Sequence, residues 1–273
     1  MAARRIRGRI RRADPLLILL PPSEGKAGPF RRGRPVDLDR LSLPELNPGR
    51  SKIIDALINI SSGPQAAEIL DLGPTAVGEL ELNRTLLEQP ARPAAEIYTG
   101  VLYDALDLAG LESAARRRAS AAIRVQSALW GPIKITDRIP PYRLSIGTNL
   151  PGIGPLPALW RQQLAGVLDD AHAQELIIDC RSTGYAAAWR PERTDKLIKV
   201  NAVTERAGNR SVVSHFAKHT RGAVARLLLQ APRSPRTVAQ VAEIVAEHAS
   251  CELTGPTRTG WELTVITDPT GRM

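Results

Sequence analysis

The most constraining feature of this chain is a run of five apolar residues, Leu16 to Leu20, close to its N-terminus. A continuous apolar run of this length is typical of a β-strand buried on both faces, as in the parallel sheets of α/β proteins. The run ends abruptly in PPSEGKAGPFRRGRPVD, a long segment rich in Pro, Gly and charge. Loops of that length are usually functional or disordered. We therefore expect a sheet covered by helices, with a functional loop after its first strand.

The rest of the chain mixes helical and strand patterns without strict alternation. Helices are predicted at 50–60, 65–72, 75–87, 112–121, 156–168 and 236–249, and strands at 123–125, 175–179, 197–203, 210–214 and 261–267. The stretch 212–229 opens like a strand end and then runs into a further helix. No internal repeat or domain linker separates them. These patterns predict one α/β domain over residues 15–273, with a mixed sheet flanked by helices, preceded by an Arg-rich flexible arm over residues 1–14.

Composition limits the classes of function. The net charge is +9, but removing the six Arg of the first twelve residues leaves +3 for the rest. A body of that charge is not a strongly basic nucleic-acid binder by charge alone. The arm could add phosphate affinity, or it could be a disordered extension or a misassigned start. No apolar run approaches a membrane span and no secretory signal opens the chain. Two Cys and four His show no disulfide or zinc spacing. We expect a cytoplasmic protein without metal or cofactor.

The segment from Val212 to Leu229 is predicted to form a two-sided helix. On a helical wheel, Phe216 and Val224 fall on a flank that can be buried, while Lys218 and Arg221 gather on the opposite flank. Two cations one turn apart suit an approaching anion. Considered alone, the same pattern fits a solvated basic face.

Polar and charged residues repeatedly follow the predicted strand ends. In open α/β sheets ligands bind beyond the carboxyl ends of the strands, so these residues converge if enough strands are parallel. Each one alone also fits a cap, a turn or a surface charge. Those after strands are Ser23, Glu24, Lys26, Ser127, Arg181, Ser182, Ser214, Lys218 and Arg221, and those in irregular segments are Tyr98, Thr99, Tyr142 and Arg143.

Together these residues predict a cationic cleft that binds an anion. A Lys that is desolvated or close to other cations has a lowered pKa and can act as a nucleophile or base, a role open to Lys26 or Lys218 beside Glu24. Arginines in such a cleft suit bidentate contacts to phosphate or carboxylate. The chain has no Walker loop, dinucleotide fingerprint or Gly-x-Ser-x-Gly elbow, so the type of reaction stays open.

Two glycine-containing turns are candidates for contacts with a DNA backbone. Gly152 and Gly154 lie in a hydrophobic-Gly-hydrophobic-Gly hairpin followed by a predicted helix, and Gly73 and Thr75 lie between two predicted helices. The first turn matches the hairpin sequence of a helix-hairpin-helix element better, whereas the second has a predicted helix on each side. Plain turns are the alternative for both.

Several segments resemble the YaaA family, also labelled DUF328 and UPF0246, and most closely its actinobacterial branch. They are LLILLPPSEGK, YTGVLYDAL, SALWGPIKITDRIPPYRLSIG, LPALW, IIDCRSTGY and VVSHFAKHTRG, in family order from Leu16 to about Leu229. The most specific are PYRL-x-x-G and S-x-F-A-K-x-x-RG. The enterobacterial type reads SPAKT where this chain has PPSEGK, so Glu24 is not shared with it.

The resemblance implies a single-domain fold of the type called cantaloupe, with a helix-hairpin-helix element and a positively charged cleft. It also implies a peroxide-stress protein that limits damage from unincorporated iron and binds double-stranded or branched DNA. The positions expected to line the cleft are Lys26, Tyr142, Arg143, Lys218 and Arg221. The chain offers no cluster of Cys, His or carboxylates that would chelate iron directly.

Two functions follow as hypotheses. One is a stress protein that binds DNA or another polyanion through its phosphates. The other is an enzyme that acts on a small anionic or nucleotide-like metabolite, using Lys26 or Lys218 with Glu24. A non-catalytic scaffold is the third alternative.

Overall fold

The computed structural model describes residues 16–172, 174–206 and 209–268. The predicted arm, residues 1–14, and the boundary at residue 15 lie outside these ranges. Within them, an eight-stranded sheet has the order β11-β12-β9-β8-β1-β3-β4, with β10 paired to β9. Its strands are β1 (Leu16–Leu20), β3 (Ile123–Ser127), β4 (Gly131–Lys134), β8 (Leu176–Asp179), β9 (Leu197–Arg206), β10 (Asn209–Ser211), β11 (Cys251–Thr257) and β12 (Gly260–Thr267).

The first strand lies in the interior of the sheet, as its apolar sequence predicts. Every residue of β1 is at most 2% exposed, and β1 pairs in parallel with both β3 and β8. The parallel pairing continues from β8 to β9 and on to β12, whereas β4, β10 and β11 are antiparallel to their neighbours. The sheet is therefore mixed, and the carboxyl ends of its five parallel strands share one edge.

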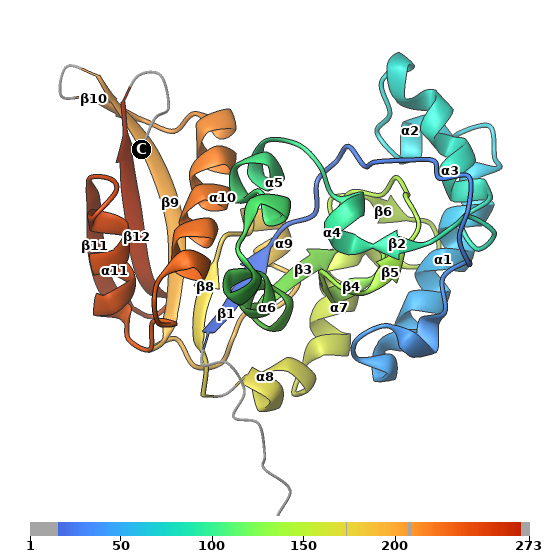
Figure 1. The fold of residues 1–273 in the computed structure, drawn as a ribbon. Helices are drawn as coiled ribbons and strands as arrows, with labels where there is room; N and C mark the ends of the chain where they lie inside the picture. Colours follow the sequence, from blue (N-terminus) through green and yellow to red (C-terminus); the bar gives the residue numbers. More distant parts are fainter. Residues whose placement is uncertain (1–15, 173, 207–208, 269–273) are drawn as a thin grey trace, which may run out of the picture.

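Helices pack on the sheet and beyond its β4 end (Figure 1). On one face lie α5 and α6 with α10, which packs on β9, and α11, which packs on β11. A second group, with α1, α2 and α3, lies beyond β4. The helices are α1 (Asn47–Ser61), α2 (Ala66–Ile69), α3 (Leu80–Arg84), α4 (Ala94–Ile97), α5 (Val101–Leu106), α6 (Ser113–Ala122), α7 (Leu156–Leu164), α8 (Val167–His172), α9 (Thr183–Ala186), α10 (Ser214–Gln230) and α11 (Val238–Ala246), with 3-10 turns η1 (Leu38–Arg40), η2 (Pro44–Leu46), η3 (Pro74–Glu79) and η4 (Leu108–Gly110).

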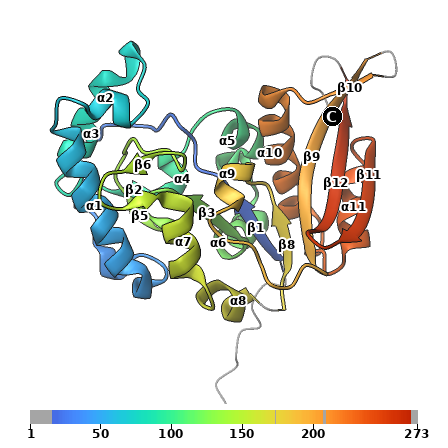
Figure 2. The ribbon, with the colours of Figure 1, turned by 180° about the vertical axis from the view of Figure 1, so that it is seen from behind.

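The opposite face is more open at β9 and β12. Along β9, Ile198 and Val200 are buried against the helical face, while Lys199 and Asn201 are only half-buried. Figure 2 shows these strands from that side, with α10 behind them. The uncovered half of the sheet therefore carries polar side chains, as period-two alternation requires.

A close helix contact explains the glycine of α10. A Cβ at Gly222 would lie 2.1 Å from the carbonyl oxygen of Leu102 and 3.0 Å from Cβ of Ala105, both in α5. Such distances are below van der Waals contact, so only glycine lets the two helices approach this closely. The role of Gly222 is therefore packing against α5.

The α/β class, the single domain and the mixed sheet are confirmed. The helix-hairpin-helix element is not confirmed. Gly152 and Gly154 lie in a small hairpin of β6 (Asn149–Leu150) and β7 (Gly154–Pro155), which α7 follows but no described helix directly precedes. Gly73 follows the four-residue α2 and Thr75 lies within η3, because Gly73-Pro74 interrupts the predicted helices. Outside the main sheet, β2 (Arg92–Pro93) and β5 (Arg138–Ile139) form a separate two-stranded sheet. No helix among the described residues is long and apolar enough to cross a membrane.

Candidate functional site

The loop after β1 carries Lys26 to the polar edge of the sheet. Lys26 forms an isolated antiparallel bridge with Tyr98, and the amide of the next residue, Ala27, donates to the carbonyl of Ile97 at 2.9 Å. The hydroxyl of Ser23 receives the amide of Thr99 at 3.1 Å and donates to the Gly25 carbonyl at 2.6 Å. These bonds fix the loop to the segment that follows α4, so that Lys26 has a defined position.

The Lys26 amine lies between backbone carbonyls and aromatic rings. Its Nζ donates to the carbonyl of Ser23 at 2.9 Å and to that of Glu24 at 3.1 Å. It also lies 4.3 Å from the centroid of the Tyr142 ring and 6.0 Å from that of Tyr98. A cation over a ring face is attracted to it. Burial nevertheless dominates and lowers the pKa of Lys26 to about 7.

Nearby charges act on the same amine in both directions. The positive charge of Arg143 lowers the pKa of Lys26 further, while the carboxylates of Glu79 and Glu24 raise it. Arg143 forms ion pairs with Glu79 at 3.5 Å and with Glu24 at 4.0 Å. Because burial and Arg143 outweigh the carboxylates, the amine changes its protonation state near neutral pH.

Arg143 is held by its backbone. The buried side chain of Asn83 donates to the carbonyl of Arg143 and receives its amide, both at 2.8 Å. This paired contact joins α3 to the segment after β5 across 60 residues. The backbone of Arg143 is therefore fixed, and its side chain extends from a defined position beside Lys26.

Beneath the amine runs a chain of buried hydroxyl groups. Ser127 Oγ lies 2.7 Å from the hydroxyl of Tyr142, which lies 3.0 Å from that of Tyr98. Ser127 Oγ already accepts the amides of Leu129 at 3.1 Å and Trp130 at 3.0 Å. With both acceptor positions used, its own proton is available only to Tyr142. These two backbone amides therefore set the direction of hydrogen bonding, in which the Ser127 hydroxyl donates to the Tyr142 hydroxyl.

These groups border a cavity of about 390 Å³. We name it the Lys26 cavity. Its charged lining groups are Lys26 and three carboxylates, those of Glu24, Glu79 and Glu81. Arg143 pairs with the first two, and Arg84 pairs with Glu81 at 3.4 Å. The cavity and its immediate neighbours are therefore close to neutral. Its lining residues are Glu24, Lys26, Gly28, Pro29, Gly78, Glu79, Glu81, Leu82, Thr85, Gln89 and Tyr142.

Arg181 and Arg221 border a different cavity, of about 520 Å³, at the carboxyl end of β8. We name it the β8-end cavity. Arg181 is buried and donates from Nε and Nη2 to the two carboxylate oxygens of Asp179, each at 2.9 Å. Arg221 donates from Nε to the Val200 carbonyl at 3.0 Å. Ser182, at the N-cap of α9, is exposed.

The remaining predicted positions lie elsewhere. Ser214 and Lys218 are exposed on α10, and neither lines the Lys26 cavity or the β8-end cavity. Thr99 is exposed at the edge of the Lys26 loop. Gly73, Thr75 and Gly152 are exposed in their turns, and Gly154 is half-buried. The structure thus brings together Ser23, Glu24, Lys26, Tyr98, Thr99, Ser127, Tyr142 and Arg143, apart from the pair Arg181 and Arg221.

Several neighbours of Lys26 were not expected from the sequence. Glu79 and Asn83 come from predicted helical segments that showed no polar motif. Tyr185, on α9, is half-buried among the site tyrosines, and burial raises its pKa to about 12. The only signal for it was its place just after the predicted strand end at Asp179.

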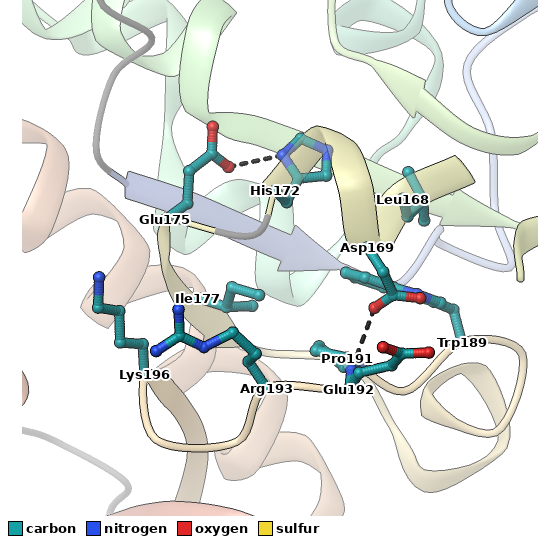
Figure 3. A pocket seen from close by; sticks show the side chains of 10 residues that line it. All are labelled: Leu168, Asp169, His172, Glu175, Ile177, Trp189, Pro191, Glu192, Arg193 and Lys196. Atoms are coloured by element: carbon teal, nitrogen blue, oxygen red, sulfur yellow. Dashed lines mark hydrogen bonds and ion pairs between the residues drawn. The ribbon is translucent and has the colours of Figure 1, made fainter. Parts of the chain in front are cut away.

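A third cavity, of about 160 Å³, lies at the amino end of β8 (Figure 3). There His172 Nδ1 lies 2.6 Å from a carboxylate oxygen of Glu175. Asp169 accepts the indole N–H of Trp189 at 3.3 Å and the amide of Glu192 at 3.1 Å. These polar groups are thus engaged with one another. Within the described part of the chain, no group of three or more His, Cys, Asp or Glu could hold a metal ion.

Comparisons with known proteins match most of the chain. The family model described as "Peroxide stress protein YaaA" matches residues 16–248. A UPF0246 protein of Streptomyces coelicolor is 44% identical over 256 residues, covering 92% of this chain and 98% of the relative. A UPF0246 protein of Corynebacterium efficiens is 41% identical over 238 residues, covering 84% and 91%. One of Idiomarina loihiensis is 29% identical over 229 residues, covering 76% and 86%.

Proposed function

The chain belongs to the YaaA family of peroxide stress proteins, and from this premise we propose that it acts in peroxide stress through acid–base chemistry in the Lys26 cavity. The ligand is a small, nucleotide-like metabolite whose polar, uncharged part enters the cavity. One observation carries the proposal: an amine with a pKa of about 7 borders a cavity of about 390 Å³. A catalytic group is most effective when its pKa lies near the operating pH.

The hydrogen bonds of Lys26 favour proton transfer over covalent attack. A neutral amine has two N–H groups and one lone pair, and two backbone carbonyls already receive hydrogen bonds from Nζ. The lone pair can therefore accept a proton from a ligand while both hydrogen bonds persist. Formation of a Schiff base would leave at most one N–H on Nζ, so at least one of the two carbonyls would lose its donor.

Size and charge favour a small ligand in this cavity. A nucleoside-sized molecule fits the volume range of ligand sites. Three lining carboxylates, each with an arginine partner, leave no excess of positive charge for a polyanion. They can instead receive N–H or O–H groups of an uncharged ligand.

The proposal is tested by survival under hydrogen peroxide. A bacterial strain that lacks its own YaaA-family protein receives this chain, Lys26→Met or the control Lys52→Met, whose lysine is exposed on α1. We expect the wild type and the control to restore survival and Lys26→Met to fail while remaining folded by circular dichroism. Full rescue by Lys26→Met would overturn the role of Lys26. Lys218→Met serves as the comparison for the other candidate lysine.

Binding of double-stranded or branched DNA is the second candidate function. Its support is the net charge of +9, to which six Arg of the first twelve residues contribute. Such binding weakens steeply with salt, because counterions are released from the phosphates. Duplex affinity is measured against salt for the full chain and for a chain without residues 1–14. If DNA binding is lost when residues 1–14 are removed, the arm carries the binding site. If DNA binding persists, the site lies on the rest of the protein.

A further inference from the structure

The β8-end cavity has the charge distribution of an anion site. Five cations line it, Arg181, Arg190, Lys199, Arg221 and Arg258, against three carboxylates, Asp179, Glu192 and Glu262. The lining groups therefore carry a net charge of +2. This contrasts with the near-neutral Lys26 cavity.

Much of this positive charge is not compensated inside the protein. Both carboxylate oxygens of Asp179 accept hydrogen bonds from Arg181. Arg190, Lys199 and Arg258 form no ion pair with any residue that the structure describes. Unpaired cations gathered around one hollow repel each other, and an anion between them removes that repulsion.

Arg181 provides the buried part of this site. Its guanidinium is held by Asp179 and by the carbonyl of Trp189, which receives Nη2 at 2.9 Å. Nη1 of the same group is buried and has no hydrogen-bond partner among the residues that the structure describes. A buried donor without a partner costs free energy.

The other walls offer neutral hydrogen-bonding groups. Thr183, Thr194 and Thr259 contribute hydroxyls. Asn201 donates to the Glu262 carboxylate at 3.5 Å, and both line the cavity. A carboxylate and an amide on this wall suit the hydroxyl groups of a sugar.

We propose that the β8-end cavity binds a small phosphate monoester that also carries hydroxyl groups, such as a nucleotide. A phosphate monoester carries about −1.5 to −2 charges near pH 7, which matches the net charge of +2 on the lining groups. A volume of about 520 Å³ accommodates a nucleotide-sized molecule. The arginines bind the phosphate oxygens and the Asn201–Glu262 wall binds the hydroxyls.

This site is separate from the one proposed for acid–base chemistry. The two cavities share no lining residue. Helix α9 lies between their residue sets: Tyr185 interacts with the site tyrosines and Arg143, and Thr183 and Ala186 line the β8-end cavity. Phosphate binding therefore does not depend on Lys26.

The test is calorimetric titration of the full chain with adenosine 5′-monophosphate, with adenosine and with a short DNA duplex. The variant Lys199→Gln/Arg258→Gln removes two cations of the cavity. The control Lys52→Gln/Arg117→Gln removes the same charge at exposed positions outside it. Circular dichroism verifies the fold of both variants.

We expect the monophosphate to bind the wild type and adenosine to bind much more weakly. Because charge-assisted hydrogen bonds are lost, the cavity variant should weaken monophosphate binding about tenfold or more. The control variant should change it less than about twofold. Equal weakening in cavity and control variants overturns the proposal. The proposal is also overturned if the duplex binds through Lys199 and Arg258 while the monophosphate does not bind. The site would then bind a phosphodiester polymer.

Discussion

The amine of Lys26 lies 4.3 Å from the centroid of the Tyr142 ring. The two residues are far apart in the chain, and each belongs to a wider arrangement. Lys26 is held by the carbonyls of its own loop, and Tyr142 by the hydroxyl of Ser127. The contact therefore joins a titratable amine to a fixed aromatic surface at the polar edge of the sheet.

Replacement of Lys26 should change how stability depends on pH. The pKa of Lys26 is about 7 in the folded chain against 10.5 as its ordinary value. Between these values the unfolded chain binds the extra proton, so the free energy of unfolding rises with pH across this window. Below pH 7 the cost of burying this lysine is fully present, at a few kcal/mol. We predict that Lys26→Met is more stable than the wild type at pH 6 and that the gain shrinks toward pH 10.

Urea unfolding at several pH values measures this difference. Lys52→Met, at an exposed position, is the control and should follow the wild type at every pH. A constant difference between Lys26→Met and the wild type from pH 6 to pH 10 would show that Lys26 does not titrate unusually.

The hydroxyl chain gives a second prediction. Tyr142→Phe keeps the ring under Lys26 but removes the oxygen that joins Ser127 and Tyr98. Because a buried O–H group of Ser127 then lacks its acceptor, we expect a loss of about 1–3 kcal/mol in the free energy of unfolding. Tyr103→Phe removes a single bond, to the Pro21 carbonyl, and should cost less. If urea unfolding shows a larger loss of stability for Tyr103→Phe than for Tyr142→Phe, the chain of hydroxyl groups is contradicted.

Asn83 should contribute strongly to stability through Arg143. Asn83→Ala leaves the amide and the carbonyl of Arg143 without partners. With two hydrogen bonds lost, we predict a decrease of about 2–4 kcal/mol in the free energy of unfolding. Asn59→Ala, at an exposed position of α1, is the matched control. Similar melting temperatures for the two variants would refute this role of Asn83.

The α5–α10 contact can be tested at its glycine. Gly222→Ala places a methyl group against the Leu102 carbonyl, and we expect it to cost about 1–3 kcal/mol or more because the helices must separate. At Gly78 a Cβ meets nothing within 4 Å, so Gly78→Ala should be neutral or slightly stabilising. Thermal unfolding compares the two. If Gly222→Ala melts like the wild type, the helices are not held at this distance.

The fold could be predicted from the sequence where local patterns decide it. The apolar run of β1 requires cover on both faces, and residues after parallel strands share one edge. This is why Ser127 and Lys26 lie near each other. The pairing of Asn83 with Arg143 could not be predicted, because it depends on the packing of α3 against a segment 60 residues away.

The basic flank of α10 shows the same limit. The helical wheel groups Lys218 with Arg221 but cannot tell what meets each side chain. In the structure Lys218 is exposed, whereas Arg221 binds the Val200 carbonyl and lines the β8-end cavity. The other cations of that cavity, among them Lys199 and Arg258, come from a strand and a hairpin turn that had no motif. Tertiary structure alone brings them together.

The most direct test of the central claim is the pKa of Lys26 itself. The chain is labelled with ¹³C-lysine and titrated by NMR, and the Lys26 signal is assigned from its absence in Lys26→Met. We predict that this signal titrates at about pH 7. A Lys26 signal that titrates near the ordinary lysine value of 10.5 would contradict an acid–base role at neutral pH.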